Sequence, residues 1–467
     1  MGTTIALLMG AGCTEPDTQL VATLMRRSAP VLTVASTDRG PDASGTAIGW
    51  HDGHLLVAWA AVNAVSPVPN SMTRDLHLQW WSLDGVPESL DEMVGVMVGY
   101  RTNWILEGDA LVSPDIGDPL ARAPQVWDRD RVWFLRAQFG QPTSWRQVSV
   151  RLAAQPNMGF IAVGLSLGTG DGIPGALPAT GTSHGVQGLL AGMPGEADCD
   201  ISQDYQRLML IDEAALTETV ETAASPVCLP TGEEELARAV DTGDPWLFTL
   251  DDGSLGAVYR MNIRSLALVY SRIDPITHAI TPPVAVGNPP ALVAGFAPGG
   301  WQPRAAVAPG GRIIFVERFV PEVAWSGARL CVRIGVFDDD GSHAHDAPWQ
   351  LACRHGGAIT EWAELFSVRE GVVLVWSERT GPAELVTARA VPDRLATINA
   401  VLLTRDGRRG SEILQIVRHD GSDPPEQFGD YEPMIAGEGE RVVVGWVDPR
   451  GTPGLYVSSF DVVPDGP

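Results

Sequence analysis

The chain has 467 residues, of which 45% are hydrophobic, so it is long enough for two or three ordinary domains or for one large repeat domain. It carries 57 acidic and 32 basic residues, a formal net charge of −25. This charge disfavours nucleic acid and anionic lipid as partners, because both are polyanions that need clustered positive charge. All 32 basic residues are arginine, which excludes chemistry that needs a lysine ammonium group, such as a Schiff base.

A short apolar segment at the N-terminus leads directly into a cysteine. The run Leu7-Leu8-Met9-Gly10-Ala11-Gly12-Cys13 is too short to span a bilayer, which takes about 20 residues. It resembles the lipobox of bacterial lipoproteins, although Gly10 stands where that family prefers leucine. The resemblance implies that residues 1–12 are a signal segment, that Cys13 is acylated, and that residues 13–29 form a tether.

This N-terminus predicts an extracytoplasmic protein at the outer membrane or the cell surface, in contact with the membrane only through the lipid on Cys13. A secreted soluble protein and a cytoplasmic protein with an incidental cysteine are the alternatives.

A short apolar block recurs along the rest of the chain. It consists of three or four aliphatic residues that follow a turn and end in Trp or a substitute, as in 54–59, 372–376 and 441–446. Seven copies recur at a mean step of about 65 residues. Their last positions are Trp59, Arg136, Gly164, Tyr259, Glu317, Trp376 and Trp446.

Each step of the repeat predicts one four-stranded antiparallel sheet. The block is apolar on both faces and is therefore expected deep in the structure, whereas the strand after it alternates, as in 330–337. The alternating strands often end in Asp-Gly, a pair that suits hairpin turns with positive φ. Such turns occur at Asp84-Gly85, Asp340-Gly341 and Asp406-Gly407.

The pattern resembles the large group of β-propeller repeats, in which such sheets are blades arranged radially. We therefore expect an all-β chain with one domain at residues 30–465, built from seven four-stranded blades, with an elaborated insertion at about 168–242. Six or eight blades and a pair of β-sandwiches are the alternatives. Residues 30–36 are expected to complete the last blade and close the ring, because the chain stops about one strand short there; a local strand of the first blade is the other interpretation.

Four of the five cysteines are arranged in two local pairs. The simplest arrangement is two disulfides, Cys199–Cys228 and Cys331–Cys353, which would indicate an oxidising compartment. Their spacings match no zinc pattern. Four buried free thiols are the alternative.

Arg136 and Glu317 stand where other copies of the block end in an aromatic residue. A charge at such a position can face the central channel of a propeller and contact a ligand there. It can equally lie at an exposed end of the strand.

The densest polar cluster is 338–346, with Asp338, Asp340, His343 and His345 as candidate metal ligands. Carboxylates favour Ca²⁺, and the two histidines favour a transition metal. The alternative is an acidic hairpin followed by a solvated loop. No other cofactor is expected.

Three classes of function remain compatible with this sequence, because a repeat scaffold does not define a ligand. The class that the sequence favours is a non-catalytic extracytoplasmic module that binds a protein or a glycan, because no catalytic motif is found. The second is a propeller hydrolase or lyase, of a glycosidase or lactonase kind, that uses carboxylates at the channel mouth. The third is a structural subunit of a cell-surface assembly. Convergence of three or more acidic or histidine side chains at one mouth would favour the enzyme.

Overall fold

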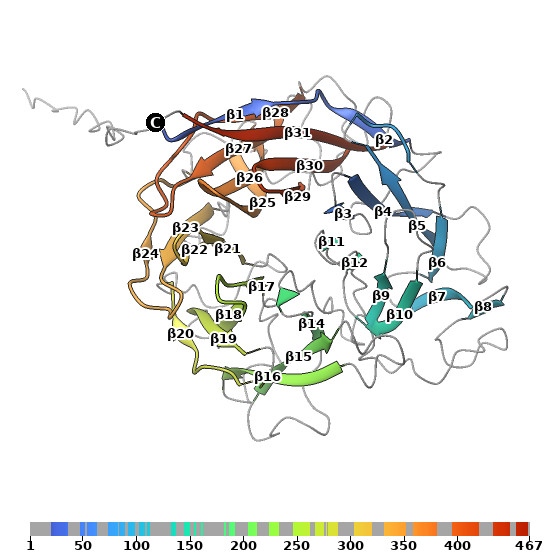
Figure 1. The fold of residues 1–467 in the computed structure, drawn as a ribbon, viewed down its shortest axis with the longest axis horizontal. Coiled ribbons are helices and arrows are strands. Elements are labelled where there is room, and N and C mark those ends of the chain that lie inside the picture. The colour runs from blue at the N-terminus through green and yellow to red at the C-terminus, as the bar shows by residue number, and fades with distance from the viewer. Residues whose placement is uncertain are drawn as a thin grey trace, which may run out of the picture.

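The computed structural model of the 467-residue chain is built entirely from β-strands in the part that it describes (Figure 1). The described residues are 20–35, 47–51, 54–62, 73–82, 84–88, 92–98, 102–107, 110–112, 132–136, 144–149, 154–155, 160–161, 182–183, 186–191, 204–212, 224–232, 246–261, 267–274, 277, 279–287, 303–319, 331–351, 358–380, 395–419, 433–448 and 454–465. No helix in this part of the chain is long and apolar enough to cross a bilayer.

The described strands form seven antiparallel sheets. The first contains β3 (Ala47–His51), β4 (His54–Val62), β5 (Thr73–Trp81), β6 (Glu92–Val98), β7 (Thr102–Glu107) and β8 (Ala110–Val112). The second contains β9 (Val132–Arg136), β10 (Ser144–Ser149), β11 (Ala154–Gln155) and β12 (Phe160–Ile161). The third contains β13 (Thr182–Ser183), β14 (Val186–Ala191), β15 (Asp204–Asp212) and β16 (Ala224–Gly232).

The next three sheets are regular four-stranded meanders. They are β17 (Trp246–Thr249), β18 (Leu255–Met261), β19 (Ala267–Ile273) and β20 (Val284–Ala285); β21 (Arg304–Ala308), β22 (Arg312–Phe319), β23 (Cys331–Phe337) and β24 (His345–Asp346); and β25 (Ala358–Val368), β26 (Gly371–Thr380), β27 (Leu395–Leu403) and β28 (Leu414–His419). The last sheet contains β29 (Met434–Glu438), β30 (Arg441–Asp448) and β31 (Gly454–Pro464), joined by β1 (Ala22–Arg26) and β2 (Val31–Ala35).

The sheets follow one another in chain order around a common centre (Figure 1). In six of the sheets the first strand lies nearest this centre, and neighbouring first strands are in contact: β13 with β17, β17 with β21, β21 with β25, β25 with β29, and β29 with β3. In the second sheet the edge strand β11, which is the third of its strands along the chain, contacts β3.

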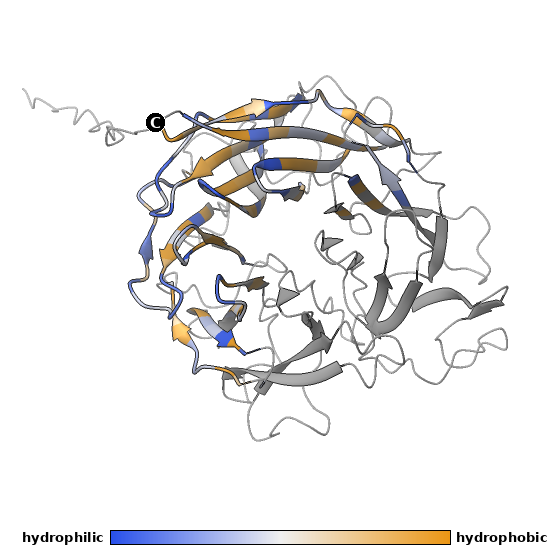
Figure 2. Ribbon diagram, in the orientation of Figure 1, coloured by the Kyte–Doolittle hydropathy of each residue, from blue (hydrophilic) through white to orange (hydrophobic). Residues whose placement is uncertain are grey.

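In five sheets the apolar block is the second strand, as β4, β18, β22, β26 and β30. On β26 the block is buried on both faces by the two neighbouring sheets. On β26, Val372, Leu374 and Trp376 pack against the sheet β21–β24. Val373 and Val375, between them, pack against the last sheet. Because successive side chains of a strand point to opposite faces, only a run of apolar residues can fill both layers. In Figure 2, hydrophobic residues (orange) run along the described strands of these sheets.

The N-terminal segment provides the outer strand of the last sheet. Strand β2 lies within residues 30–36, as the sequence predicted, whereas β1 lies within residues 13–29, so the expectation of a tether is wrong for residues 22–26. Strand β2 pairs with the first half of β31, and β1 pairs with its second half. Side chains reinforce the pairing: the hydroxyl of Thr33 donates to the carbonyl of Leu455 at 2.9 Å, and Nε of Arg27 lies 2.6 Å from Oδ2 of Asp461. The two ends of the described chain are thus held in one sheet.

Two segments differ from the expected spacing of one sheet per block. The third block contributes β12, which pairs with β9 of the second block, so these two blocks share a sheet. Residues 182–232, within the region expected as an insertion, form a four-stranded sheet of their own. The strands β11, β12 and β13 have two residues each, which is too short for periodicity to reveal them.

The two ends of the sheets differ in the length of their connections. At one end, the first strand joins the second through short turns, such as 369–370 and 439–440, and the third joins the fourth through turns such as 404–413. We call this the short-turn end. At the opposite end, the second strand joins the third through segments that range from 449–453 to 381–394, and each sheet joins the next through longer segments such as 420–433. We call this the long-connection end.

The Asp-Gly turns dock onto the preceding sheet at the short-turn end. Gly407 has a φ of +72°, and a Cβ added there would lie 2.6 Å from Cβ of Ala347. Gly341 repeats the arrangement, with a φ of +83° and Val284 as its neighbour at 3.0 Å. Glycine is needed at these turns both for its backbone conformation and for the close approach.

We predict that Gly407→Ala lowers the free energy of unfolding by about 2–4 kcal/mol, because it combines left-handed strain with overpacking. The matched control is Gly311→Ala, with a φ of +82° and no atom within 4 Å, which should cost about 1–2 kcal/mol. Urea unfolding of the two variants measures the difference. Equal destabilisation would show that the contact with the preceding sheet is unimportant.

Candidate functional site

Three side chains occupy the same repeat position on three successive first strands. Trp246 on β17 lies opposite Val258, Arg304 on β21 opposite Val316, and Glu364 on β25 opposite Val375. Each of these valines immediately precedes the last position of its block. Trp246, Arg304 and Glu364 therefore lie at one level around the centre, and we call them the inner-strand cluster.

The members of the inner-strand cluster contact one another in series. The guanidinium carbon of Arg304 lies 4.3 Å from the centroid of the Trp246 ring. Nε of Arg304 donates to both carboxylate oxygens of Glu364 at 2.9 Å. The indole N–H of Trp246 donates to the carbonyl of Ala305 at 2.8 Å, which fixes the ring in place.

The cluster is largely shielded from water, since the side chains of Arg304 and Glu364 are 11% and 15% exposed. Burial raises the pKa of Glu364 above its usual value of 4.5, and the neighbouring Arg304 opposes the shift without cancelling it. A carboxyl group that keeps its proton to higher pH can serve as a general acid. The cluster thus combines a proton donor, a fixed positive charge and an aromatic ring.

The cluster lies near the middle of the sheets rather than at one end. Trp246 and Arg304 begin β17 and β21, whereas Glu364 is the seventh of the eleven residues of β25. Long loops that a rigid framework holds in place commonly carry the binding residues of a protein.

Glu317 is placed at the end of its block on β22, with its side chain 2% exposed. Its Oε1 accepts a hydrogen bond from Nη1 of Arg333 at 3.1 Å, on the neighbouring strand β23. A Cβ on Gly287, in the preceding sheet, would lie 3.3 Å from the same nitrogen. At this position, where other copies of the block have an aromatic side chain, Glu317 forms an ion pair that is buried where two sheets meet. Arg136 ends β9, but its side chain lies outside the described residues, so its role stays a prediction.

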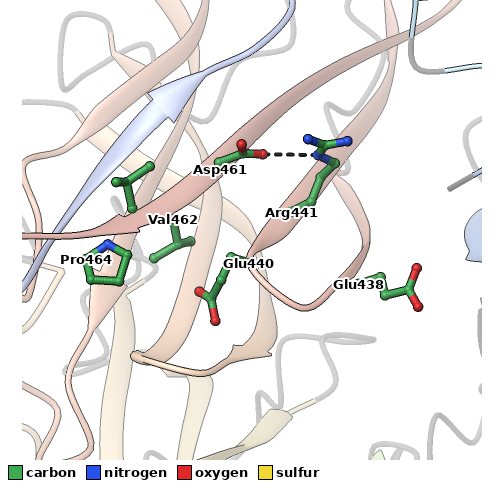
Figure 3. A pocket seen from close by; sticks show the side chains of 7 residues that line it. Glu438, Glu440, Arg441, Asp461, Val462 and Pro464 are labelled. Atoms are coloured by element: carbon green, nitrogen blue, oxygen red, sulfur yellow. Dashed lines mark hydrogen bonds and ion pairs between the residues drawn. The ribbon is translucent and has the colours of Figure 1, made fainter.

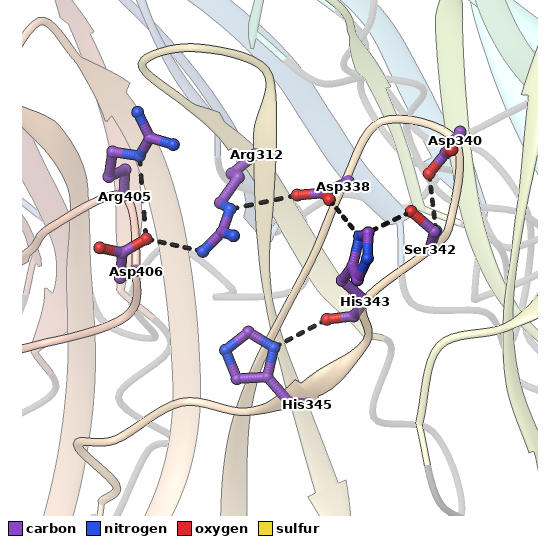
Figure 4. Close-up of polar contacts among 8 residues, drawn as sticks. All are labelled: Arg312, Asp338, Asp340, Ser342, His343, His345, Arg405 and Asp406. Atoms are coloured by element: carbon purple, nitrogen blue, oxygen red, sulfur yellow. Dashed lines mark hydrogen bonds and ion pairs between the residues drawn. The ribbon is translucent and has the colours of Figure 1, made fainter.

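The four candidate metal ligands do not converge (Figure 4). Asp338 is held by Nε of Arg312 at 3.1 Å and by Nδ1 of His343 at 2.7 Å. Asp340 accepts the backbone N–H of Ser342 within its own turn, and His345 bonds the carbonyl of His343. Among the described residues, no three His, Cys, Asp or Glu side chains are grouped to hold a metal.

Arg312 instead joins two sheets at this point. Its Nη1 lies 2.6 Å from Oδ1 of Asp406, in the Asp-Gly turn of the following sheet. The acidic cluster therefore contributes to contacts between turns at the short-turn end (Figure 4).

A cavity of about 510 Å³ lies at the short-turn end of the last sheet (Figure 3). It is lined by Glu438, Glu440, Arg441, Asp461, Val462, Val463 and Pro464. Asp461 is neutralised by Arg441 at 3.1 Å, and the side chains of Glu438 and Glu440 point in different directions. Burial raises the pKa of Glu440. The carboxylates do not meet at one point, so the cavity has less capacity for chemistry than the inner-strand cluster.

The predicted cysteine pairs stay predictions. Cys228 lies on β16 and Cys331 on β23, but their side chains are outside the described residues, as are Cys13, Cys199 and Cys353 altogether.

Sequence inspection missed all three members of the inner-strand cluster. A signal was available: aligning each first strand by its distance from the following block would have placed them in one column. Their chemical types differ, however, and the register between first and second strands depends on turn length.

Comparison with known proteins identifies no family. No protein-family model matches the chain, and no curated protein sequence matches it. Among solved structures, it is similar to a protein of unknown function from Dyadobacter fermentans, with 11% identity, a TM-score of 0.39, and coverage of 94% of this chain and 99% of that one.

Two further similar structures are an alpha-L-arabinanase from Penicillium chrysogenum and the polysaccharide lyase Uly1. The first shows 11% identity and a TM-score of 0.37, covering 96% of this chain and 99% of the other. The second shows 10% identity and a TM-score of 0.38, with 95% and 99% covered. Similarity at this level transfers no residue role to this chain.

We predict that Glu364 makes stability depend on pH in the acidic range. Because its folded-state pKa is raised, the folded chain binds the proton more tightly, and stability falls as pH rises from about 4.5 through the folded pKa. In Glu364→Gln this loss should disappear, so its free energy of unfolding should fall less over that window. Glu412→Gln, at an exposed position, is the control; identical slopes for Glu364→Gln and wild type would contradict the assigned shift.

Proposed function

We propose that the chain is a β-propeller of seven blades that acts on a polysaccharide, as a hydrolase or a lyase, at its long-connection end. The seven sheets, the contacts between their first strands and the pairing of β1 and β2 with β31 support the propeller. The inner-strand cluster is the observation that carries the activity.

Two members of the cluster suit requirements of this chemistry, and the third holds them in place. Hydrolysis of a glycosidic bond needs a carboxylic acid that protonates the leaving oxygen, and a raised pKa prepares Glu364 for that role. Arg304 lies beside it and supplies positive charge for a carboxylate or hydroxyl group of the sugar. The buried Trp246 ring packs against the guanidinium of Arg304 and holds it in place.

A non-catalytic glycan-binding or protein-binding module is the second candidate. The observation that favours it is the bidentate contact of Glu364 with Arg304, since a carboxylate held in this way is also a fixed element of a binding surface.

Turnover of polymers tests the first candidate against the second. We expect the purified protein to release reducing ends or unsaturated uronates from arabinan or ulvan, polymers chosen because similar structures include an arabinanase and ulvan lyases. Glu364→Gln should lower the rate about 10²- to 10⁴-fold, as for loss of a general acid. Glu412→Gln, at the short-turn end, should leave it unchanged. Binding without turnover would favour the second candidate. If the protein neither binds nor cleaves these polymers, both candidates are contradicted.

We also propose that Cys13 carries a lipid that anchors the protein at the outer membrane or cell surface, with its partner a glycan or protein of the cell envelope. The apolar run before Cys13 supports this proposal.

Growth of the producing bacterium with a radioactive fatty acid tests the anchor. The wild-type protein should take up the label and fractionate with membranes, and Cys13→Ser should do neither. Absence of label on the wild type, or label that survives in Cys13→Ser, would remove the anchor.

A further inference from the structure

We infer that the anchored protein stands with the short-turn end of its last sheets toward the membrane and presents the long-connection end to the outside. This orientation rests on the proposed anchor at Cys13. Three observations support it: the place where the chain enters the fold, the reach of the segment before it, and the local balance of charge.

The chain enters the fold at the short-turn end. The backbone N–H groups of Val21 and Ala22 donate to the carbonyl of Gly410, at 2.8 and 3.1 Å, in the connection between β27 and β28. The N–H of Asp465 donates to the carbonyl of Val21 at 3.0 Å, and Ala22 lies opposite Pro464 at the end of β31. These contacts fix the start of β1 beside the turns of two neighbouring sheets.

The segment between Cys13 and Leu20 is short. Seven residues span at most about 25 Å when fully extended, at 3.3–3.6 Å per residue. The strand β31, Gly454–Pro464, runs about 35 Å from the long-connection end to the entry point, at 3.3 Å per residue. An anchored Cys13 therefore keeps the entry point close to the lipid, and the far ends of the strands are beyond the reach of this segment.

The surface around the entry point is less acidic than the chain as a whole. The turns 369–370, 404–412 and 438–441 contain five arginines and five carboxylates, so their charges balance. The whole chain carries −25. An anionic lipid surface repels a negative surface within about a Debye length, so the balanced turns approach the bilayer at the lowest cost.

The orientation has a consequence for the proposed activity. A polysaccharide is too large to reach a site that faces the bilayer at close range. With the short-turn end inward, the long connections meet polymers from the surroundings, and the lipid restricts only the opposite end.

The absence of lysine from the chain allows a specific test. Arg408→Lys and Arg418→Lys each introduce one amine for an amine-reactive donor dye, without a change of charge. Both positions are exposed and belong to the same sheet, with Arg408 at the short-turn end and Arg418 toward the other end of β28. They are separated by roughly 25 Å along the strand.

The lipidated variants are reconstituted into vesicles that contain a lipid with an acceptor dye on its headgroup. We expect a larger loss of donor fluorescence from the Arg408→Lys variant than from the Arg418→Lys variant. Equal loss would indicate an edge-on arrangement, and a larger loss from Arg418→Lys would indicate the reverse orientation; either result overturns the inference.

Two controls separate this result from failure of the anchor. The protein without an added lysine gives the background from the N-terminal amine. The same variants with Cys13→Ser should show no transfer when mixed with vesicles. If the fatty-acid label is absent from the wild type, the anchor itself fails; if the label is present and the two donors respond equally, only the orientation fails.

Discussion

The whole arrangement depends on second strands that are buried on both faces. Val372 to Trp376 on β26 contribute alternately to the apolar layer on either side, and β22 and β30 do the same. Each fully buried Val or Leu side chain contributes about 1.5–3 kcal/mol. A single sheet cannot bury both faces of such a strand, so each sheet requires a neighbour on either side. The apolar core is accordingly divided into layers between successive sheets.

The last sheet meets the same requirement by recruiting strands from the other end of the chain. Without β1 and β2, β31 would expose an unpaired edge, which favours association with other chains. The pairing also fixes where the N-terminal segment enters the fold, beside Gly410 and the final strand. The pairing of β1 and β2 with β31 thus completes the last sheet. It also determines from which end of the sheets a segment anchored at Cys13 would extend.

The first strands of the sheets contribute both to packing at the centre and to the inner-strand cluster. Neighbouring first strands approach one another at the centre, where a large side chain of one sheet meets that of the next. At one level these side chains are an indole, a guanidinium and a carboxylate. Burial raises the pKa of Glu364, because Arg304 only partly offsets the loss of solvation. A group with a perturbed pKa at a shared centre is a candidate for function with a stated physical cause.

The sequence by itself determined the all-β class, the identity of the second strands in five of the sheets, the Asp-Gly turns and the pairing of residues 30–36 with the last unit. These features are local or periodic, and each follows from burial on two faces or from backbone conformation. Only the tertiary structure decided that the second and third blocks share a sheet, that Glu317 pairs with Arg333 on the neighbouring strand, and that Trp246, Arg304 and Glu364 meet. The first two depend on strand register, and the third brings together residues about 60 positions apart, which periodicity along one chain does not specify.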